Sequence, residues 1–333
     1  MTGPILGDMS QYLFLRRQTS VTRSEVTTLS NDLASGTASD LARHLAGQTG
    51  IVAAIQTSLS RLSAFDQTIA RATSRADAMQ AALDKVDTAA RSAANDLLQA
   101  AGAGGAALDT ATAIGRAAFD DAVNALNTRI GDRSLFAGTA TDRDALLAPE
   151  ALLAAARLAI APATAPADIA AALDRWLADP AGFTATAFLG SSDTTAIAVA
   201  EDIAVTLPVT AADPDLRGTF KGLILAALLS DSSFAGDRAA RAELATLAGS
   251  ALIQSGDDRT AAAARLGVAQ ERIATAEARN SAEATALGIA RSDLVAIDGY
   301  ETASRLAEAQ TRLETIYTLT ARLSDLSLAN YLR

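Results

Sequence analysis

Cysteine is absent from this chain of 333 residues, and histidine occurs once, at His44. The absence of cysteine excludes disulfide bonds and thiolate metal sites, and it suits a protein that must keep its fold outside the cytosol. A single histidine excludes a metal site built from several imidazoles. We therefore expect no bound metal.

Aromatic residues make up 4% of the chain, although 50% of its residues are hydrophobic. Much of this apolar content is alanine, which favours helix and lets neighbouring helices approach closely. The longest apolar run, residues 223–229, is too short to cross a membrane. Residues 1–15 lack the basic and apolar segments of a cleaved signal peptide. We expect no membrane span. If the protein is exported, the export machinery would have to recognise a segment that is not cleaved.

A concentrated basic surface is also missing, because the formal net charge is −10. Binding a nucleic acid backbone requires such a surface, so we expect no nucleic acid partner. Residues 301–333 balance four acidic residues against four arginines. The acidity therefore lies in the body of the chain, where it indicates a solvated surface.

What the chain does have is a long heptad repeat within residues 51–97. Such spacing places the repeating residues on one stripe of a helix that another helix must cover. At about 1.5 Å per residue the helix would be roughly 70 Å long, more than a compact domain needs. The only polar interruption is Ser58, and the stripe contains Ile51, Ile55, Ser58, Leu62, Phe65, Ile69, Ala72, Ala76, Met79, Leu83, Val86, Ala90, Ala93 and Leu97.

The same repeat occurs near both ends of the chain, over residues 12–33, 266–297 and 306–327. It is weakest at Asn280 and Glu283, and Asp298-Gly299 separates the last two stretches. Two long helical arms at opposite ends of one chain can cover each other's stripes if they pack antiparallel. The predicted fold is mainly α: a long antiparallel helical rod, or coiled-coil bundle, formed by the N- and C-terminal segments.

The middle of the chain differs in composition. Every proline except Pro4 lies between residues 149 and 214, together with Trp176, the only tryptophan. We interpret this region as an inserted smaller α+β domain. The predicted helices lie near residues 150–160, 167–178, 216–229 and 236–254, and the predicted strands lie near 183–189 and 195–207. The predicted divisions are terminal arms at 1–45 and 299–333, a rod at 46–139 and 256–298, and the insertion at 140–255.

Residues that could support catalysis are few. No nucleophile elbow accompanies His44, so a role at the surface or in a helix cap is the better interpretation. The glycine-rich run at residues 102–105 follows no predicted strand, so we interpret it as a helix break. The adjacent acids at 120–121 and 257–258 would point in different directions on a helix. We predict no catalytic residue and no cofactor.

Four short motifs resemble those of one family. Residues 29–36 read Leu-Ser-Asn-Asp-Leu-Ala-Ser-Gly and are similar to the Leu-x-x-x-Leu-x-Ser-Gly signature near the start of bacterial flagellins and hook-filament junction proteins. Residues 133–139 resemble the Leu-Phe-Ala-Gly-Thr turn with which that superfamily enters its variable domain, and residues 264–273 resemble the Leu-Gly-x-x-x-x-Arg-Ile segment of its C-terminal rod. Residues 323–332 resemble the Leu-Ser-Leu-x-Asn-Tyr-Leu ending of the hook-filament junction proteins.

Two departures from the flagellin pattern favour the junction proteins. Flagellins usually continue the Ser-Gly with Arg-Ile-Asn and a pair of acids, whereas Thr37-Ala38-Ser39-Asp40 follows here. They also usually end in a Val-Leu-x-Leu-Leu-Arg tail, and this chain ends Asn330-Tyr331-Leu332-Arg333.

The resemblance implies a structural component of the bacterial flagellum that joins hook to filament, its terminal helices packing in a tubular array. The arms would then serve assembly, and residues 140–255 would form the variable outer domain. The implied partners are further copies in a homo-oligomeric ring, the hook-side junction protein, flagellin, and an export chaperone on the C-terminal arm. The implied location is extracellular, after type III export. The expected interaction residues are Tyr12, Leu15, Val26, Leu29, Leu33, Leu306, Leu313, Ile316, Leu323, Leu326, Leu328, Tyr331 and Leu332.

Alternative interpretations stay open. The nearest is flagellin itself, the filament subunit. The heptad stripes also suit an ordinary intramolecular bundle or a cytosolic coiled-coil scaffold or signalling protein. An enzyme is the most remote alternative and depends on His44 alone.

Overall fold

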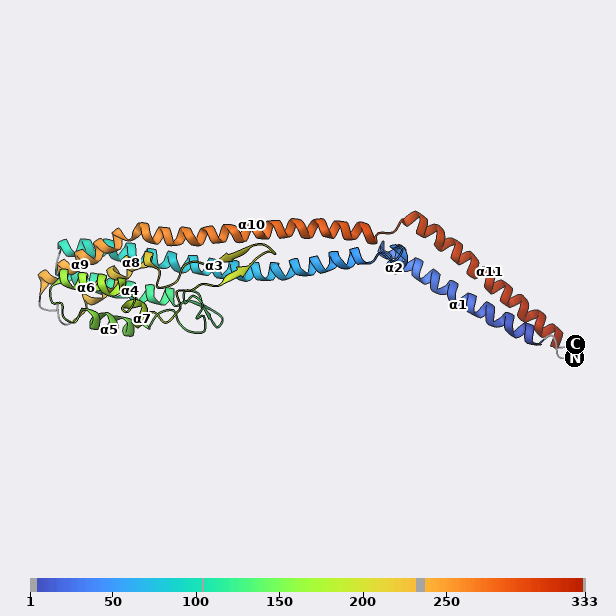
Figure 1. Ribbon diagram of the computed structural model, residues 1–333, viewed down its shortest axis with the longest axis horizontal. Coiled ribbons are helices and arrows are strands. Elements are labelled where there is room, and N and C mark those ends of the chain that lie inside the picture. The colour runs from blue at the N-terminus through green and yellow to red at the C-terminus, as the bar shows by residue number, and fades with distance from the viewer. Residues whose placement is uncertain (1–4, 104, 232–236, 332–333) are drawn as a thin grey trace. The chain divides into compact units, whose positions relative to one another are not determined.

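The structure, a computed structural model, describes residues 5–103, 105–231 and 237–331, with side chains from residue 10 to residue 323 of these ranges. The chain forms two compact units: residues 1–61 with 282–333 (unit 1), and residues 62–281 (unit 2). Long helices dominate both, as Figure 1 shows. This confirms the predicted mainly α fold.

In unit 1 the two ends of the chain pack against each other. Helix α1 (Ile5–Ser35) lies antiparallel to α11 (Gly299–Tyr331), and the two run side by side in Figure 1. The short α2 (Leu41–His44) follows α1. Unit 1 also contains the first turns of α3 (Gly50–Ala103) and the last turns of α10 (Gly256–Val295).

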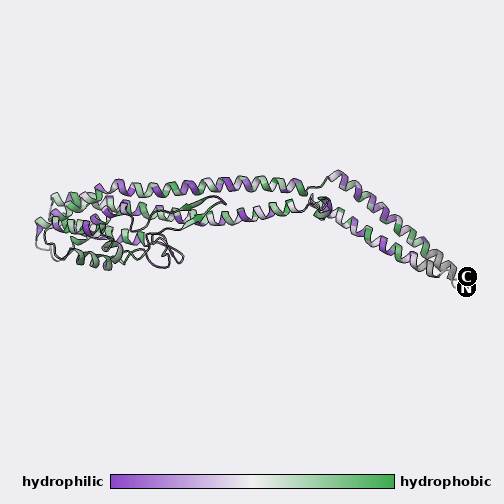
Figure 2. Cartoon of the chain, in the orientation of Figure 1, coloured by the Kyte–Doolittle hydropathy of each residue, from purple (hydrophilic) through white to green (hydrophobic). Residues whose placement is uncertain are grey.

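In unit 2 the predicted heptad stripe of α3 is buried. Helix α10 runs antiparallel beside α3 (Figure 1), and the Gln270 side-chain amide donates a 2.8 Å hydrogen bond to Asp77. Figure 2 shows hydrophilic and hydrophobic residues alternating along α10, as expected for a helix with one covered face. Phe65 is half-buried, and the fully buried positions are Leu62, Ile69, Ala72, Ala76, Met79, Leu83, Val86, Ala90, Ala93 and Leu97.

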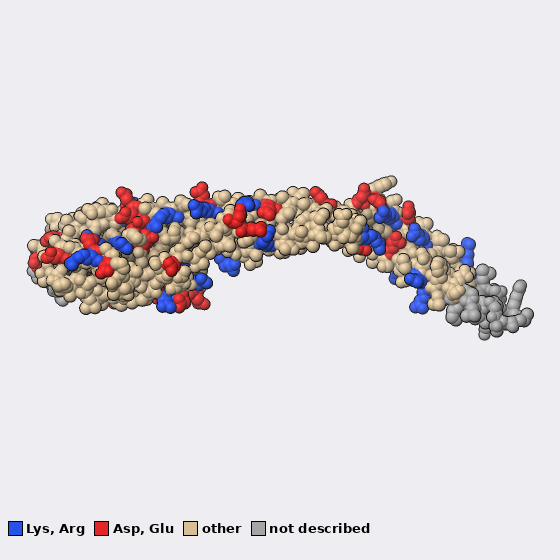
Figure 3. All heavy atoms as spheres, in the orientation of Figure 1, with Lys and Arg blue, Asp and Glu red and all other residues tan. Residues whose placement is uncertain are grey.

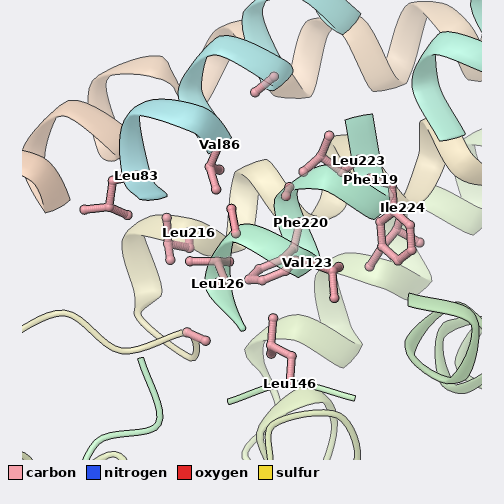
Figure 4. Close-up of a cluster of buried hydrophobic side chains, with 14 of the residues drawn as sticks. Leu83, Val86, Phe119, Val123, Leu126, Leu146, Leu216, Phe220, Leu223 and Ile224 are labelled. Atoms are coloured by element: carbon pink, nitrogen blue, oxygen red, sulfur yellow. The ribbon is translucent and has the colours of Figure 1, made fainter. Parts of the chain in front are cut away.

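Helix α4 (Ala106–Leu126) begins after the glycine-rich break and packs closely on α8 (Arg217–Leu228). Gly115 permits this approach, because a Cβ atom there would lie 2.9 Å from the Cβ of Ala226. Helix α9 (Arg238–Gln254) packs on α8 and approaches α3 in the same way, since a Cβ on Gly249 would lie 2.7 Å from Leu98 Cγ. The core between these helices is drawn in Figure 4, with Val86 of α3, Phe119 and Val123 of α4, and Phe220 and Leu223 of α8.

The smaller elements complete unit 2. Helices α5 (Pro149–Ile160) and α6 (Pro166–Ala178) each begin with proline in the first turn, where its missing N–H costs nothing. The 3₁₀ turn η1 (Pro214–Leu216) leads into α8. Two antiparallel hairpins pair β1 (Arg129–Ile130) with β2 (Arg133–Ser134) and β3 (Ala196–Ala198) with β4 (Ala204–Thr206). These bounds confirm the predicted helices of this region. The single strand predicted near 195–207 is instead two short strands, β3 and β4, joined as a hairpin.

The predicted strand at residues 183–189 is wrong. Its first four residues form a single helical turn, α7 (Phe183–Thr186). The Thr186 hydroxyl donates to the carbonyl of Gly182 at 2.7 Å, which favours the turn over a strand. The Phe183 ring packs edge-on against Trp176, with centroids 5.5 Å apart, and lies 5.0 Å from the Phe220 ring. Tertiary packing of one aromatic ring therefore overrides the β propensity of its neighbours.

One hydrophobic core runs through unit 2, from α3 and α4 through α5, α6 and α8 to α10. The predicted boundaries near residues 140 and 255 lie within this unit. The division into arms, rod and outer domain stays a prediction.

Candidate assembly surface

The seam between α1 and α11 is formed on each helix by residues that recur alternately three and four positions apart. Thr22 is 1% exposed and Ile316 is 6% exposed, and Ala309 and Thr302 are also buried. An ion pair of 3.7 Å between Glu25 and Arg312 joins the two helices. The half-buried positions of the seam are Leu15, Thr19, Val26, Leu29, Leu306, Leu313, Thr320 and Leu323.

Threonines in this seam form hydrogen bonds within their own helices. The Thr19 hydroxyl donates to the carbonyl of Leu15 at 2.8 Å, and the Thr320 hydroxyl donates to that of Ile316 at 2.7 Å. A threonine bonded in this way presents its methyl group outward, so it can lie in an apolar seam without an unpaired hydroxyl.

The Ser-Gly motif forms the turn that ends α1. Gly36 has a positive φ of 71°, a conformation that favours glycine. Asp32 accepts a 2.8 Å hydrogen bond from the backbone N–H of Ser39. The turn is bonded to the α10–α11 junction, because the Ala38 N–H donates to the Val295 carbonyl at 2.9 Å. The motif therefore places the end of α1 beside the break between α10 and α11.

Large apolar side chains remain exposed on the outer faces of this helix pair. Tyr12, Leu13 and Phe14 of α1 are 58%, 57% and 66% exposed. Tyr317 and Leu319 of α11 are 49% and 46% exposed. Of the fifteen large apolar residues exposed in the described part of the chain, ten lie in unit 1, although it is the smaller unit. Exposed apolar residues concentrated in this way mark an interaction surface.

A groove of about 560 Å³ lies along the pair, lined by Tyr12, Arg16, Thr19, Arg23 and Tyr317 among others. Neither arginine forms an ion pair with any residue that the structure describes. The groove therefore combines two aromatic rings with two guanidinium groups that can still bind a carboxylate, a combination suited to a protein surface. On the face shown in Figure 3, basic and acidic residues are otherwise interspersed.

The predicted interaction residues divide into four groups. Tyr12 and Leu33 are exposed, and Ile316 is buried in the seam. Leu15, Val26, Leu29, Leu306, Leu313 and Leu323 are half-buried there. The side chains of Leu326, Leu328 and Tyr331, and the whole of Leu332, lie outside the described residues. Their role in assembly stays a prediction.

Leu13, Phe14 and the two groove arginines were not among the predicted interaction residues. A usable signal was present, because residues 12–15 are four consecutive large apolar residues. One seam can bury only part of such a run, since successive helical residues point in different directions.

The residues considered for catalysis lie on different helices. His44 is exposed at the end of α2, and Asp120 forms an ion pair with Arg116 at 3.1 Å. Asp257 and Asp258 lie in the first turn of α10. Over the described ranges, no three or more residues that could ligate a metal come together. No helix in these ranges has the length and apolar character needed to span a bilayer.

Two family models match the chain. Residues 9–141 match the bacterial flagellin N-terminal helical region, and residues 254–332 match the bacterial flagellin C-terminal helical region. Together the matched ranges cover most of the chain and contain most of both α1 and α11. No curated protein sequence matches significantly.

Solved structures with a similar fold include a Vibrio parahaemolyticus protein described as a flagellar hook-associated protein. It aligns with a TM-score of 0.52 and 16% sequence identity over 73% of this chain and 95% of its own. At that identity the likeness concerns the fold.

Proposed function

Because this chain belongs to the bacterial flagellin family, we propose that it is the subunit that joins the flagellar hook to the filament. The family is structural and non-enzymatic, and its members assemble with their own copies and with other flagellar components. The observation that carries the proposal is the exposed apolar surface of the α1–α11 pair. A monomer gains nothing from leaving Tyr12, Phe14 and Tyr317 in water, whereas a tubular array would bury them.

Two features support a junction subunit over a filament subunit. The C-terminal Asn330-Tyr331-Leu332 resembles the ending of junction proteins, and Thr37-Ala38 replaces the usual flagellin continuation. A filament subunit is the second candidate, because both flagellin regions match.

The partners follow from this role. Copies of the chain would form a ring through α1 and α11, with the hook-side junction protein on one side and flagellin on the other. An export chaperone would cover the apolar positions of α11 before secretion. The protein would reach the outside through the flagellar type III apparatus, and residues 140–255 would project from the tube.

Deleting the gene and examining cells by electron microscopy tests the role. We expect hooks without filaments, with flagellin released into the medium. Loss of the most abundant flagellar protein would instead identify a filament subunit. Normal filaments in the deletion strain would contradict both roles.

A pair of substitutions tests the surface itself. Phe14→Ser should leave the monomer folded but fail to restore filaments to the deletion strain. Leu158→Ser is the matched control, because Leu158 is an equally apolar residue that is 80% exposed in unit 2. Equal restoration by both variants would contradict an assembly role for this face.

A further inference from the structure

Unit 2 contains a small cavity with two arginines in its wall. Its volume is about 110 Å³, and its lining includes Arg75 of α3, Arg133 of β2, Thr141, Thr194 and Thr195. These residues come from three separate stretches of the chain, all within unit 2. The cavity shares no residue with the α1–α11 surface, so a ligand bound here would be independent of the proposed function.

The guanidinium of Arg75 has no partner among the residues that the structure describes. Its Nε atom is buried without a hydrogen bond, and no described carboxylate pairs with it. Arg133 likewise forms no ion pair with a described residue. Two acids close in sequence to Arg133 pair with other arginines: Asp142 with Arg143 at 3.2 Å and Asp144 with Arg129 at 3.3 Å.

Two other arginines of unit 2 with low exposure are paired. Arg259, whose side chain is 4% exposed, lies 2.9 Å from Asp87, and Arg241 lies 2.8 Å from Asp109. Burying a charge without a partner is costly, and buried guanidinium groups are normally paired. The Arg75 site departs from this rule, because its charged neighbour Arg133 has the same sign. Burial lowers the pKa of Arg75, and the charge of Arg133 lowers it further.

The loop around the cavity is fixed in place. Gly138, also in the lining, has a φ of 61°, and a Cβ atom there would collide with the Ser191 carbonyl oxygen at 1.9 Å. The backbone at Gly138 therefore lies directly against the segment that carries Thr194 and Thr195. The segment that carries Arg133 and the segment that carries the two threonines are thus packed against each other through their backbones.

We propose that this cavity binds a small tetrahedral oxyanion, phosphate or sulfate, between Arg75 and Arg133. Each guanidinium can donate two parallel hydrogen bonds to such an anion, and threonine hydroxyls can donate further ones. The cavity is large enough, since a water molecule takes about 30 Å³ of the liquid and the space would hold several. The anion supplies the negative charge that no described carboxylate supplies to Arg75 and Arg133. It also links α3 to the 133–141 and 194–195 segments.

Thermal unfolding of the full-length protein tests the proposal, with unit 2 followed through the emission of Trp176, the only tryptophan. Tens of millimolar phosphate or sulfate should raise the unfolding midpoint by about 2–4 °C relative to chloride at equal ionic strength. Because both anions also stabilise proteins nonspecifically, the measure is the difference between the parent and its variants. Arg75→Gln and Arg133→Gln should each remove the difference, and Arg71→Gln, an exposed arginine of the same helix, should retain it.

The variants provide a second readout in chloride alone. Arg75→Gln should unfold at or above the parent's midpoint, because it removes an unpaired charge and the repulsion from Arg133. An equal phosphate effect in the parent and in both cavity variants would overturn the proposal, as would the absence of any effect. A stronger effect of acetate than of phosphate would also overturn it, and would indicate a carboxylate as the ligand.

Discussion

The side-chain amide of Asn280 donates a 2.8 Å hydrogen bond to the backbone carbonyl of Val199. Asn280 is buried on the seam of α10, at one of the two positions where the heptad repeat is weakest, and Val199 follows strand β3. The polar interruption therefore attaches the β3–β4 hairpin to the long helix. A leucine at this position would improve the repeat but leave the Val199 carbonyl without its partner.

Asn280→Ala should lower the free energy of unfolding by about 1–3 kcal/mol, because it leaves a buried carbonyl unsatisfied. The control is Arg279→Ala, which removes a 3.1 Å ion pair with Asp202 between two exposed side chains. Exposed pairs contribute about 1 kcal/mol or less. Denaturant unfolding of both variants gives the comparison, and an equal loss in the two would contradict the proposed role of Asn280.

A buried arginine joins four helices of unit 2. Arg259 of α10 donates to Asp87 of α3 at 2.9 Å, to the Ser255 hydroxyl at 2.8 Å, to the Leu252 carbonyl at 3.0 Å and to the Thr219 hydroxyl at 3.2 Å. Asp87→Ala should lower the free energy of unfolding by about 3–5 kcal/mol, because it leaves this charge buried and unpaired.

The matched control for this network is Arg91→Ala. Arg91 also pairs with Asp87, at 2.8 Å, but its side chain is 64% exposed. Its removal should cost about 1 kcal/mol or less. If chemical denaturation gave similar losses for Asp87→Ala and Arg91→Ala, the Arg259 network would not be a major source of stability.

The heptad stripe of α3 can be tested at Ile69, which is 2% exposed. Ile69→Asp should cost several kcal/mol, because it places an unpaired charge in an apolar seam. Ala70→Asp introduces the same charge at the neighbouring, exposed position and should have little effect. Thermal melting within one or two degrees of the parent for Ile69→Asp would show that the stripe is not the core.

The terminal arms should be less stable than unit 2. Their seam contains threonines and small residues, and most of its large apolar positions are only half-buried, so burial offsets the entropy of ordering only narrowly. Limited proteolysis of the dilute protein should cut α1 and α11 well before α3. Protection should appear in the assembled array or with a chaperone.

Removing residues 301–333 provides the complementary test. The truncated protein should keep the unfolding transition of unit 2, followed by Trp176, because the described core of that unit contains no residue of α11. It should lose both chaperone binding and incorporation into the flagellum. An independent role for the arms would be contradicted if α1 and α11 resisted protease as well as α3 does. It would also be contradicted if the truncated protein lost the unfolding transition followed by Trp176.

The sequence predicts the long helices well because their signals are local. The stripe of α3, the glycine-rich break before α4 and the Asp298-Gly299 break before α11 all lie within or beside the elements they define. The strand predicted at 183–189 is wrong because Phe183 is positioned by rings from α6 and α8. Contacts between residues such as Arg259 and Asp87, 172 positions apart, follow from the fold and from no local pattern.

The sequence alone indicates only part of the candidate surface. The periodicity identifies the seam of α1, but it cannot tell which seam residues a single partner helix covers. The exposed run that includes Leu13 and Phe14 has a signal in the sequence, because it contains more consecutive apolar residues than one buried face of a helix can include. Arg16 and Arg23 can bind a partner's carboxylate only if no acid of the folded helix pair already pairs with them. The sequence does not reveal which acids lie near them.

The back-bonded threonines of the arms have a consequence for recognition. Because the hydroxyls of Thr19 and Thr320 are satisfied by their own helices, they need no hydrogen bond from a neighbouring chain. These two positions therefore set no hydrogen-bonding requirement on a partner, and the surface discriminates by shape and by the charges of Arg16 and Arg23. In the proposed role of a joint between two different polymers, that tolerance at the two threonines would help the same helix pair to contact unlike neighbours.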